Sequence, residues 1–437
     1  MRLTNVARMG LPQGRLYSYA VEVSGPGEAI PVSFDQARHV GAGERPGSWM
    51  AIAFRLPTDA TQRRLAQTWL AVVRRHGTLH SVFSPGDPQP VLHDVEVGPG
   101  EWREHQVAPG RLTRDVLREV LDAGCTPYGS PSHLLCLVES GDGRPVVVIG
   151  ADHAHVDMWS LLVVLRDLLA EFRRPAGAAA LPEARSFAEH TLELESRPRA
   201  PAQVRGRWHE VLTDCGGVMP CFPLPLGDLA VPVAEVVEVR DVLGSAQVSG
   251  LVAYGRAHGV RLLPVVVAAM TEVTADLAGQ PLRAVFPVHS RYDERWHDSV
   301  GWFITNAVIE SVEPGPVAAG EAVKEAMRLG SWPLADVLAP YGGMPAAPGM
   351  FAISWLDLGR LPVSTDPALA AQLVGAVTRT DGVMLWFVLD ESGLHLRCRY
   401  PRTPEAHDSV GRWLDALVAR LRELAATPVG EAPIHVS

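Results

Sequence analysis

The chain has 437 residues, of which 47% are hydrophobic and 20% are charged, and this composition is typical of a globular protein rather than a disordered one. This length is sufficient for two lobes that each bury a substantial core. The formal net charge of −10 argues against a nucleic-acid-binding protein, because phosphate binding needs a basic face. The five cysteines are scattered without C-x-x-C spacing, so they signal neither a zinc site nor a disulfide framework.

The ends and apolar runs of the sequence give no sign of targeting to a membrane. Residues 1–15 lack the apolar core of a signal peptide, and no apolar run is long enough to span a bilayer. We therefore expect a cytoplasmic protein without a membrane span.

The first part of the chain predicts strands that alternate with helices. Residues 1–30 are mixed, and no element is assigned to them. Apolar residues at every second position of 49–56 predict a half-buried strand. Thr58 or Asp59 can cap the helix that follows, and Gly77 ends it. The further elements expected here are a strand over 78–83 and a hairpin of two strands over 134–138 and 146–150.

The composition changes between residues 176 and 232, where Ala- and Pro-rich segments predict an extended connector. Strands and amphipathic helices resume beyond it, so both halves have an α+β order. We expect an N-terminal lobe over 1–175, the connector over 176–232, and a C-terminal lobe over 233–437. The elements expected in the last lobe are strands over 233–242, 282–288, 384–389 and 393–400 and helices over 264–277 and 405–425.

The stretch 146–160 carries the strongest signal for chemistry. Its β-branched apolar run predicts a buried strand, and Ser160 can cap a following helix. Two histidines and two carboxylates lie between strand and helix, at Asp152, His153, His155 and Asp157. Such strand-to-helix loops often present functional side chains.

Three interpretations of this polar loop compete. It can be a solvated loop without function, which is common for one short motif. It can be a metal site, because His153, His155 and Asp157 alternate and share one side of an extended segment. A hydrolase pattern of this type closes with a second histidine, but Met158 stands in that place, so we expect no metal. It can finally present His153 as a general base, since an imidazole titrates near neutral pH.

Five blocks in order carry a further signal: Pro31 to Arg38, Arg75 to Phe83, the His-x-x-x-Asp motif at His153 and Asp157, Pro287 to Arg291, and Val300 to Asn306. In this order the blocks resemble the condensation-domain superfamily of nonribosomal peptide synthesis, in particular its free-standing, polyketide-associated acyltransferases. The resemblance covers essentially the whole chain.

The resemblance implies an α+β fold of two chloramphenicol-acetyltransferase-like lobes, arranged as a V-shaped pseudo-dimer with an active-site tunnel between them. An acyl thioester on carrier-protein phosphopantetheine or on coenzyme A is the implied donor, and an alcohol or amine is the implied acceptor. No bound cofactor is implied. His153 is the implied catalytic base, and Asp157 is a structural residue that pairs with Arg291.

Two positions depart from the family motif. Asp152 stands in place of its first histidine, and Met158 in place of its glycine, which puts the oxyanion arrangement and the substrate size in doubt. Weaker candidates for lining the tunnel are Asp152, Met158, Trp159 and Asn306. His155 is expected in the loop, facing solvent or a channel wall.

The sequence thus predicts an acyltransferase that makes an ester or amide in natural-product biosynthesis, with an acyl or peptidyl carrier protein as partner. The alternatives are a non-catalytic, condensation-like docking module and a metal-dependent hydrolase.

Overall fold

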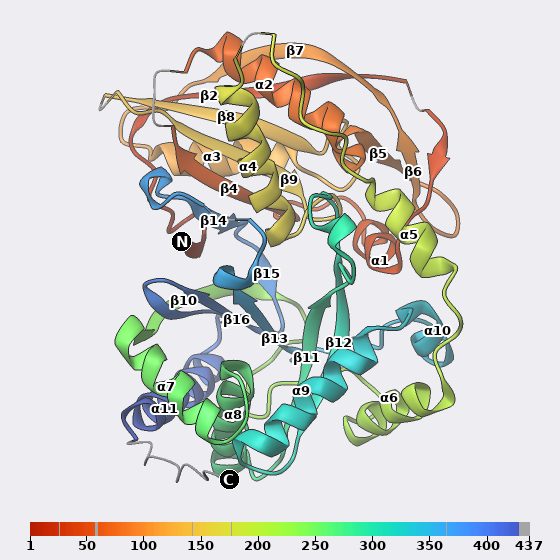
Figure 1. The fold of residues 1–437 in the computed structure, drawn as a ribbon, viewed down its shortest axis with the longest axis vertical. Helices are drawn as coiled ribbons and strands as arrows, with labels where there is room; N and C mark the ends of the chain where they lie inside the picture. Colours follow the sequence, from red (N-terminus) through yellow and green to blue (C-terminus); the bar gives the residue numbers. More distant parts are fainter. Residues whose placement is uncertain (26, 57–59, 142, 176, 364, 428–437) are drawn as a thin grey trace, which may run out of the picture. The chain divides into compact units, whose positions relative to one another are not determined.

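A computed structural model describes residues 1–25, 27–56, 60–141, 143–175, 177–363 and 365–427 (Figure 1). Backbone contacts divide the chain into two compact units that each contain sheets and helices, as expected for an α+β fold. The units are Met1–Arg197 with His289–Ile304 and Leu361–Thr378, and Pro198–Val288 with Thr305–Arg360 and the chain from Arg379 onward. The predicted domains were consecutive segments. The compact units are instead interleaved, because the first one takes in two segments from the second half of the chain.

The main sheet of the first unit has seven strands among the described residues, in the order β1-β14-β4-β9-β8-β2-β7. A smaller sheet has the order β3-β6-β5. The strands are β1 (Arg2–Asn5), β2 (Gly14–Ser24), β3 (Ala29–Ile30), β4 (Trp49–Arg55), β5 (Ser81–Ser84), β6 (Val91–Asp94), β7 (Glu96–His105), β8 (His133–Ser140), β9 (Val146–Asp152) and β14 (Gln372–Gly375). The helices are α1 (Phe34–Gly41), α2 (Gln62–Arg75), α3 (Thr113–Gly124), α4 (Met158–Arg173) and α5 (Phe187–Glu195).

Strand β9 lies inside this sheet and pairs in antiparallel register with both β4 and β8. All of its residues are buried, which explains why its sequence is continuously apolar. The strand predicted over 49–56 is confirmed as β4, but it is not half-buried, because Trp49 and Ala51 are as buried as Ile52 and Phe54. Helix α3 packs on one face of the sheet, while α4 contacts β4 and α2.

Gly150 of β9 lies in close contact with α3. A Cβ atom on Gly150 would lie 2.6 Å from the Cδ2 atom of Leu121 on α3, so a larger residue there would require the Leu121 side chain to move.

Local signals explain other element ends. The predicted caps Thr58 and Asp59 lie outside the described residues, and the side chain of Thr61 caps α2. The expected strand over 78–83 is in part wrong, because a 3₁₀ turn over Gly77–His80 precedes β5.

The sheet of the second unit also has seven described strands, in the order β12-β11-β13-β16-β17-β10-β15. They are β10 (Val233–Gly244), β11 (Leu282–His289), β12 (Ile304–Ser311), β13 (Phe351–Asp357), β15 (Arg379–Thr380), β16 (Val383–Asp390) and β17 (Gly393–Pro401). The helices are α6 (Ala202–Asp214), α7 (Ser245–Ala257), α8 (Leu262–Ala278), α9 (Pro316–Gly330), α10 (Leu334–Leu338) and α11 (Pro404–Ala426).

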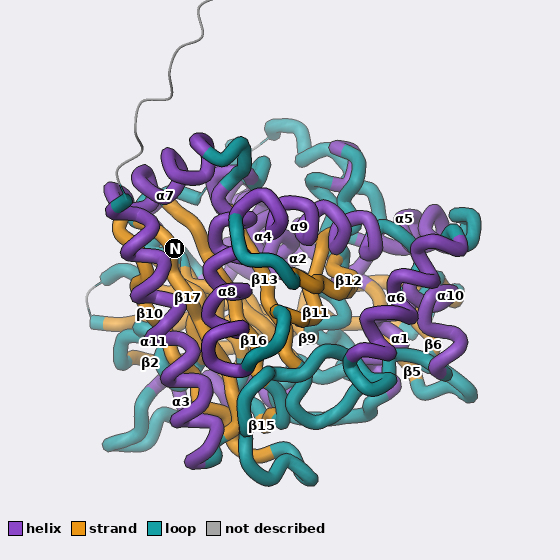
Figure 2. Tube along the Cα trace, turned by 90° about the horizontal axis from the view of Figure 1, so that it is seen from below, coloured by secondary structure: helices purple, strands orange, loops and turns teal. Residues whose placement is uncertain are grey.

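Helices α7, α8 and α11 pack together beside the strands β10, β16 and β17 (Figure 2). The apolar stripe of α11 that the sequence predicts is buried in this core, at Val410, Leu414, Leu417, Leu421 and Leu424. Within the described ranges, no helix has the length and apolarity that crossing a membrane requires.

Candidate active site

The predicted polar loop lies between the end of β9 and the start of α4. The Asp157 side chain, and not Ser160, caps α4: its Oδ1 accepts a hydrogen bond of 2.7 Å from the Ser160 backbone N–H. The N-cap prediction failed by three residues, because an aspartate caps as well as a serine does. The serine hydroxyl is thereby left for another role.

Asp157 and Arg291 form the predicted ion pair. Arg291 Nη1 donates to Asp157 Oδ2 at 2.8 Å, and both side chains are almost fully buried. Arg291 Nη2 also donates to Ser160 Oγ at 2.8 Å and to the Ser299 carbonyl at 3.1 Å. The guanidinium carbon lies 3.9 Å from the centre of the Phe303 ring. The buried charges are therefore compensated by each other, by hydrogen bonds and by an aromatic face.

The same carboxylate and hydroxyl hold the segment that carries Trp302. The Phe303 backbone N–H donates to Asp157 Oδ2 at 3.1 Å, and the Gly301 N–H donates to Ser160 Oγ at 3.1 Å. A Cβ atom on Gly301 would lie 2.5 Å from the Phe187 ring, so only glycine fits this close approach. Because the backbone is fixed on both sides of Trp302, the direction of its side chain is fixed as well.

The Trp302 ring stacks on the His153 imidazole. The ring centres are 4.1 Å apart and the planes differ by 21°. The His153 backbone N–H donates to the Ser48 carbonyl at 3.0 Å, which anchors the residue beside β4. The His153 side chain is half-buried and its Nδ1 atom is fully buried. Nε2 is therefore the ring nitrogen that can face a substrate.

A second histidine lies next to this pair. His39 is 6.1 Å from His153 between ring centres and contacts Trp302 edge-on at 5.1 Å. Arg45 Nη2 lies 2.9 Å from His39 Nδ1, and His39 Nε2 lies 3.1 Å from Asp152 Oδ1. Arginine can only donate, so Nδ1 accepts and Nε2 carries the hydrogen that bonds to Asp152.

Asp152 is the centre of this network and does not line a tunnel. It is fully buried, and its Oδ1 also accepts the Ala154 backbone N–H at 2.9 Å. Ser48 Oγ donates to its Oδ2 at 2.5 Å. Burial raises its pKa, but the hydrogen bonds that it accepts from His39 and Ser48 outweigh burial, so the pKa is lowered overall. Asp152 is thus an ionised support for the loop.

The electrostatics favour a neutral His153. Burial is the largest cause that lowers its pKa, and nearby His39 lowers it further. The residue's own backbone and the carboxylates Asp152 and Asp157 oppose this shift only in part. A neutral imidazole can accept a proton at physiological pH.

Four further residues of the predicted site differ in burial and in contacts. The prediction for His155 is wrong: it is buried, its Nε2 lies 3.2 Å from the Ser81 carbonyl oxygen, and its ring meets Phe83 edge-on. Trp159 is buried and packs against Arg291 at 4.8 Å, so it braces the ion pair. Met158 is half-buried at the first position of α4. Asn306 is half-buried on β12 of the second unit.

Sequence reasoning missed Gln36, His39 and Trp302. Gln36 Nε2 donates to the Ala154 carbonyl at 2.8 Å and so supports the loop directly. His39 directly follows the block Pro31–Arg38, and Trp302 lies inside the block Val300–Asn306. The blocks therefore carried a signal, but the contacts that give these residues their roles join distant segments.

The metal interpretation finds no support in the part of the chain that the structure describes. No group of three or more histidine, cysteine or carboxylate side chains there is arranged to hold an ion. His155 bonds to a backbone carbonyl and Asp157 bonds to Arg291, so the alternating residues do not converge.

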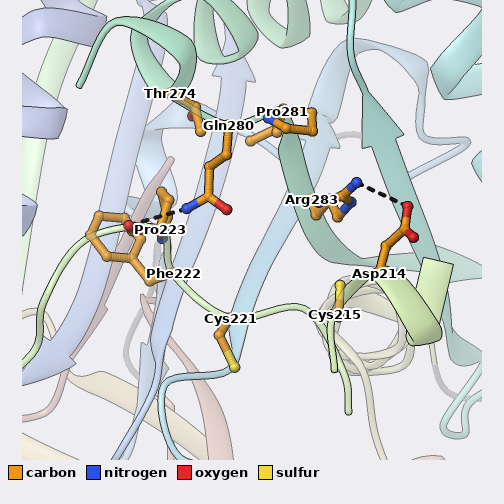
Figure 3. A pocket seen from close by; sticks show the side chains of 10 residues that line it. Asp214, Cys215, Cys221, Phe222, Pro223, Thr274, Gln280, Pro281 and Arg283 are labelled. Carbon is orange, nitrogen blue, oxygen red and sulfur yellow. Dashed lines mark hydrogen bonds and ion pairs between the residues drawn. The ribbon is translucent and has the colours of Figure 1, made fainter. Parts of the chain in front are cut away.

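A separate cavity of about 250 Å³ lies in the second unit (Figure 3). Its arginine, Arg283, is already paired with Asp214 at 3.1 Å and with Glu310 at 2.6 Å. Burial raises the pKa of the Cys215 thiol to about 11 and also raises that of Cys221, so both thiols stay protonated. The cavity thus offers neither a base nor an activated nucleophile.

Known proteins resemble the chain over almost its full length. Acyltransferase PapA3 of Mycobacterium tuberculosis is 26% identical over 436 residues, which cover 91% of this chain and 89% of PapA3. The structure of a PapA2 acyl transferase matches with a TM-score of 0.83 at 22% identity, over 98% of this chain and 100% of that one. The first condensation domain of the calcium-dependent antibiotic synthetase matches with a TM-score of 0.68 at 16% identity, over 92% and 98%. No family model matches.

A condensation-domain fold that presents a His-x-x-x-Asp loop defines the class of protein. Within that class the chain is an acyltransferase similar to PapA3.

We expect Asp157→Ala to destabilise the protein by about 3–5 kcal/mol, because it leaves the buried Arg291 without its partner. Arg291→Ala should cost a similar amount, and the double variant should cost less than the sum. Urea unfolding of the three variants measures this. Equal costs for Asp157→Ala and the half-buried His153→Ala would contradict the structural role of Asp157.

The Asp157–Arg291 ion pair also predicts how the stability of the protein depends on pH. Burial raises the Asp157 pKa, but Arg291 and Ser160 outweigh it, so the folded-state pKa lies below the ordinary value. The ionised Asp157 carboxylate therefore contributes its full stabilisation above the unfolded-state pKa of about 4. This stabilisation is lost as the pH falls through the folded-state pKa. The stability difference between the wild type and Asp157→Asn should shrink on acidification. If the stability difference between the two proteins stays constant down to the pH at which they unfold, the stabilising role of the ionised Asp157 is contradicted.

Trp302→Leu should raise the pKa of His153 toward its ordinary value of about 6.5, because a smaller side chain admits water to the imidazole. It should also remove a stacking contact worth about 0.5–1.5 kcal/mol. Trp302→Phe is the matched control, since it keeps an aromatic face. NMR titration of the His153 ring measures the shift, and an unchanged titration in the leucine variant would show that the stack does not bury the imidazole.

Proposed function

We propose that the protein transfers an acyl group from a thioester to an alcohol or amine, with His153 as the general base. The observation that carries this proposal is the neutral, stacked imidazole of His153, held on a loop braced by the Asp157–Arg291 pair. Its fully buried Nδ1 leaves Nε2 to receive the proton.

The proposed reaction balances as follows. His153 Nε2 takes the proton of the acceptor hydroxyl or amine while the acceptor oxygen or nitrogen attacks the thioester carbonyl. The tetrahedral intermediate then collapses, the carbon–sulfur bond breaks, and the imidazolium returns the proton to the departing thiolate. The products are an ester or amide and a free thiol. General-base catalysis of this kind contributes about 10²–10⁴-fold to the rate.

We propose that the donor thiol belongs to phosphopantetheine on an acyl or peptidyl carrier protein, or to coenzyme A. The support is the likeness to a condensation domain and to acyltransferases. The two units would form the V-shaped pair of lobes implied by the resemblance, with donor and acceptor meeting in a tunnel between them. Holding both reactants in one orientation can lower the barrier by about 7–11 kcal/mol.

Natural-product or lipid biosynthesis is the proposed setting, since PapA2 and PapA3 are acyltransferases and the structural relatives include a peptide-antibiotic synthetase domain. Asn306, which the sequence resemblance placed near the reaction, remains a proposed tunnel residue.

We expect His153→Ala to lower turnover of an acyl thioester by at least about 10²-fold, the low end for a lost general base. His209→Ala is the matched control, because His209 is exposed on α6 and pairs with Tyr341. Acyl-transfer assays, with circular dichroism to confirm folding, compare the two. A loss below tenfold in folded His153→Ala would refute the base role, and a folded wild type that transfers no acyl group but binds carrier proteins would favour a docking module.

Met158 is expected to restrict what enters beside His153. It is the first residue of α4, directly after the capping Asp157, and its long apolar side chain is only half-buried. Met158→Gly should then accept larger donors or acceptors while it keeps most of the turnover with the native pair. Met158→Ala separates side-chain volume from the cost of a glycine in a helix. An unchanged substrate range together with a lower melting temperature would mean that Met158 is a packing residue.

A further inference from the structure

Two arginines on β17 of the second unit, Arg397 and Arg399, form no ion pair within the described ranges although carboxylates lie near them. Arg397 is 5% exposed, and neither it nor its neighbour Arg399 forms an ion pair with any residue in the described ranges. The Nε atoms of both are buried without a hydrogen-bond acceptor there. Arg399 Nη2 donates a long hydrogen bond of 3.8 Å to the sulfur of Met384.

This situation differs from that of the other buried arginine, Arg291, which has a carboxylate, a hydroxyl and a carbonyl as acceptors. A buried charge without an acceptor is costly, and native structures rarely keep one without a reason. Burial, and then the like charge of Arg399, lower the pKa of Arg397 to about 10, so the guanidinium still carries its charge at neutral pH.

The alternation of β17 places both arginines on the face of the sheet opposite its helices. Leu396 and Cys398 point into the core formed with Trp413 of α11, so Arg397 and Arg399 point the other way. Figure 2 shows β17 beside β10 and β16, and the helices α8 and α11 near them.

An aromatic side chain packs against the arginines on this face. Trp386 is directly opposite Arg397 in the antiparallel pairing of β16 with β17, and the Arg397 guanidinium carbon lies 4.4 Å from its ring centre. Val239, the partner of Arg397 on β10, is 40% exposed, and Arg399 is half-buried, so this face is partly open. Glu235 acts electrostatically on both arginines, and Asp381 acts on Arg399.

We propose that Arg397 and Arg399 form a binding site for an oxyanion group, a carboxylate, sulfate or phosphate, on a molecule whose apolar part contacts Trp386. Guanidinium groups have the fork geometry that binds such groups with two hydrogen bonds, and Trp386 holds the Arg397 plane in place. If the proposed acyl transfer is correct, this group comes from one of two sources: the phosphate of the thioester donor or a charged group of the acceptor.

The test measures anion binding directly and needs no acyl-transfer activity, so its result does not depend on the proposed function. Thermal unfolding is followed as sodium sulfate or phosphate replaces sodium chloride at constant ionic strength. Sulfate stabilises many proteins by exclusion from their surface, so the comparison between variants is the readout. The wild type should show a saturable rise in melting temperature.

Arg397→Met keeps a side chain against Trp386 but removes the charge, and it should weaken the half-saturating response about tenfold or more, as expected for lost charge-assisted hydrogen bonds. Arg399→Met should weaken it as well and serves as the second variant if the first folds poorly. Arg412→Met is the matched control, because it removes one exposed charge that pairs with Asp408 on α11. It should respond as the wild type does.

Competition identifies the source of the group. If coenzyme A displaces sulfate and pantetheine, which lacks the phosphate, does not, the donor supplies the oxyanion. If neither displaces it, the acceptor supplies it. A response that is equal in the wild type and both arginine variants, absent in all of them, or lost equally in Arg412→Met would overturn the proposal and leave Arg397 as a packing residue on Trp386.

Discussion

The buried ion pair of Asp157 and Arg291 is the interaction on which the candidate site depends. One carboxylate caps α4, pairs with Arg291 and accepts the Phe303 backbone N–H. Ion pairs of this kind add little net stability compared with apolar packing, but removal of one member is costly. Its value here is positional, since it ties the end of the His153 loop to a segment more than a hundred residues away in sequence.

The segment around Arg291 and Phe303 also carries Trp302, which stacks on His153. Ser160 and Asp157 fix the backbone on both sides of Trp302, and Trp302 then holds the imidazole of His153 by stacking. The ion pair therefore acts on the imidazole through two intermediates and does not touch it. The other side of the loop is held independently, because Asp152 bonds to His39 and Ser48 where the family motif has a histidine. Asp152 thus stands as a hydrogen-bonded carboxylate, with a lowered pKa, where the family motif has a ring that titrates near neutral pH.

The sequence predicted the parts of this site that lie within one motif and missed those that tertiary contacts create. The apolar run of β9, the loop and α4 follow from local patterns, and the Asp157–Arg291 pair followed from a family resemblance. The roles of His39 and Trp302 could not be predicted, because ring stacking depends on how α1 and the segment after Trp296 meet the loop. The same holds for the interleaved units: β14 pairs with β1 and β4, and nothing in its four residues identifies those partners.

The two buried arginines, Arg291 and Arg397, differ in the acceptors that surround them. This difference separates an arginine with a structural role from one that can bind a ligand. Arg291 has its acceptors within the protein, and an aromatic ring covers one face of its guanidinium. Arg397 packs on an aromatic ring, feels the charge of Glu235, and has no hydrogen-bond acceptor for its buried Nε in the described chain. A cation–π contact compensates only part of the cost of burying a charge, about 0.5–2 kcal/mol, whereas an unpaired charge in an apolar environment costs more. The same physical rule that makes Asp157 indispensable to Arg291 therefore points to a directly bound anion for Arg397.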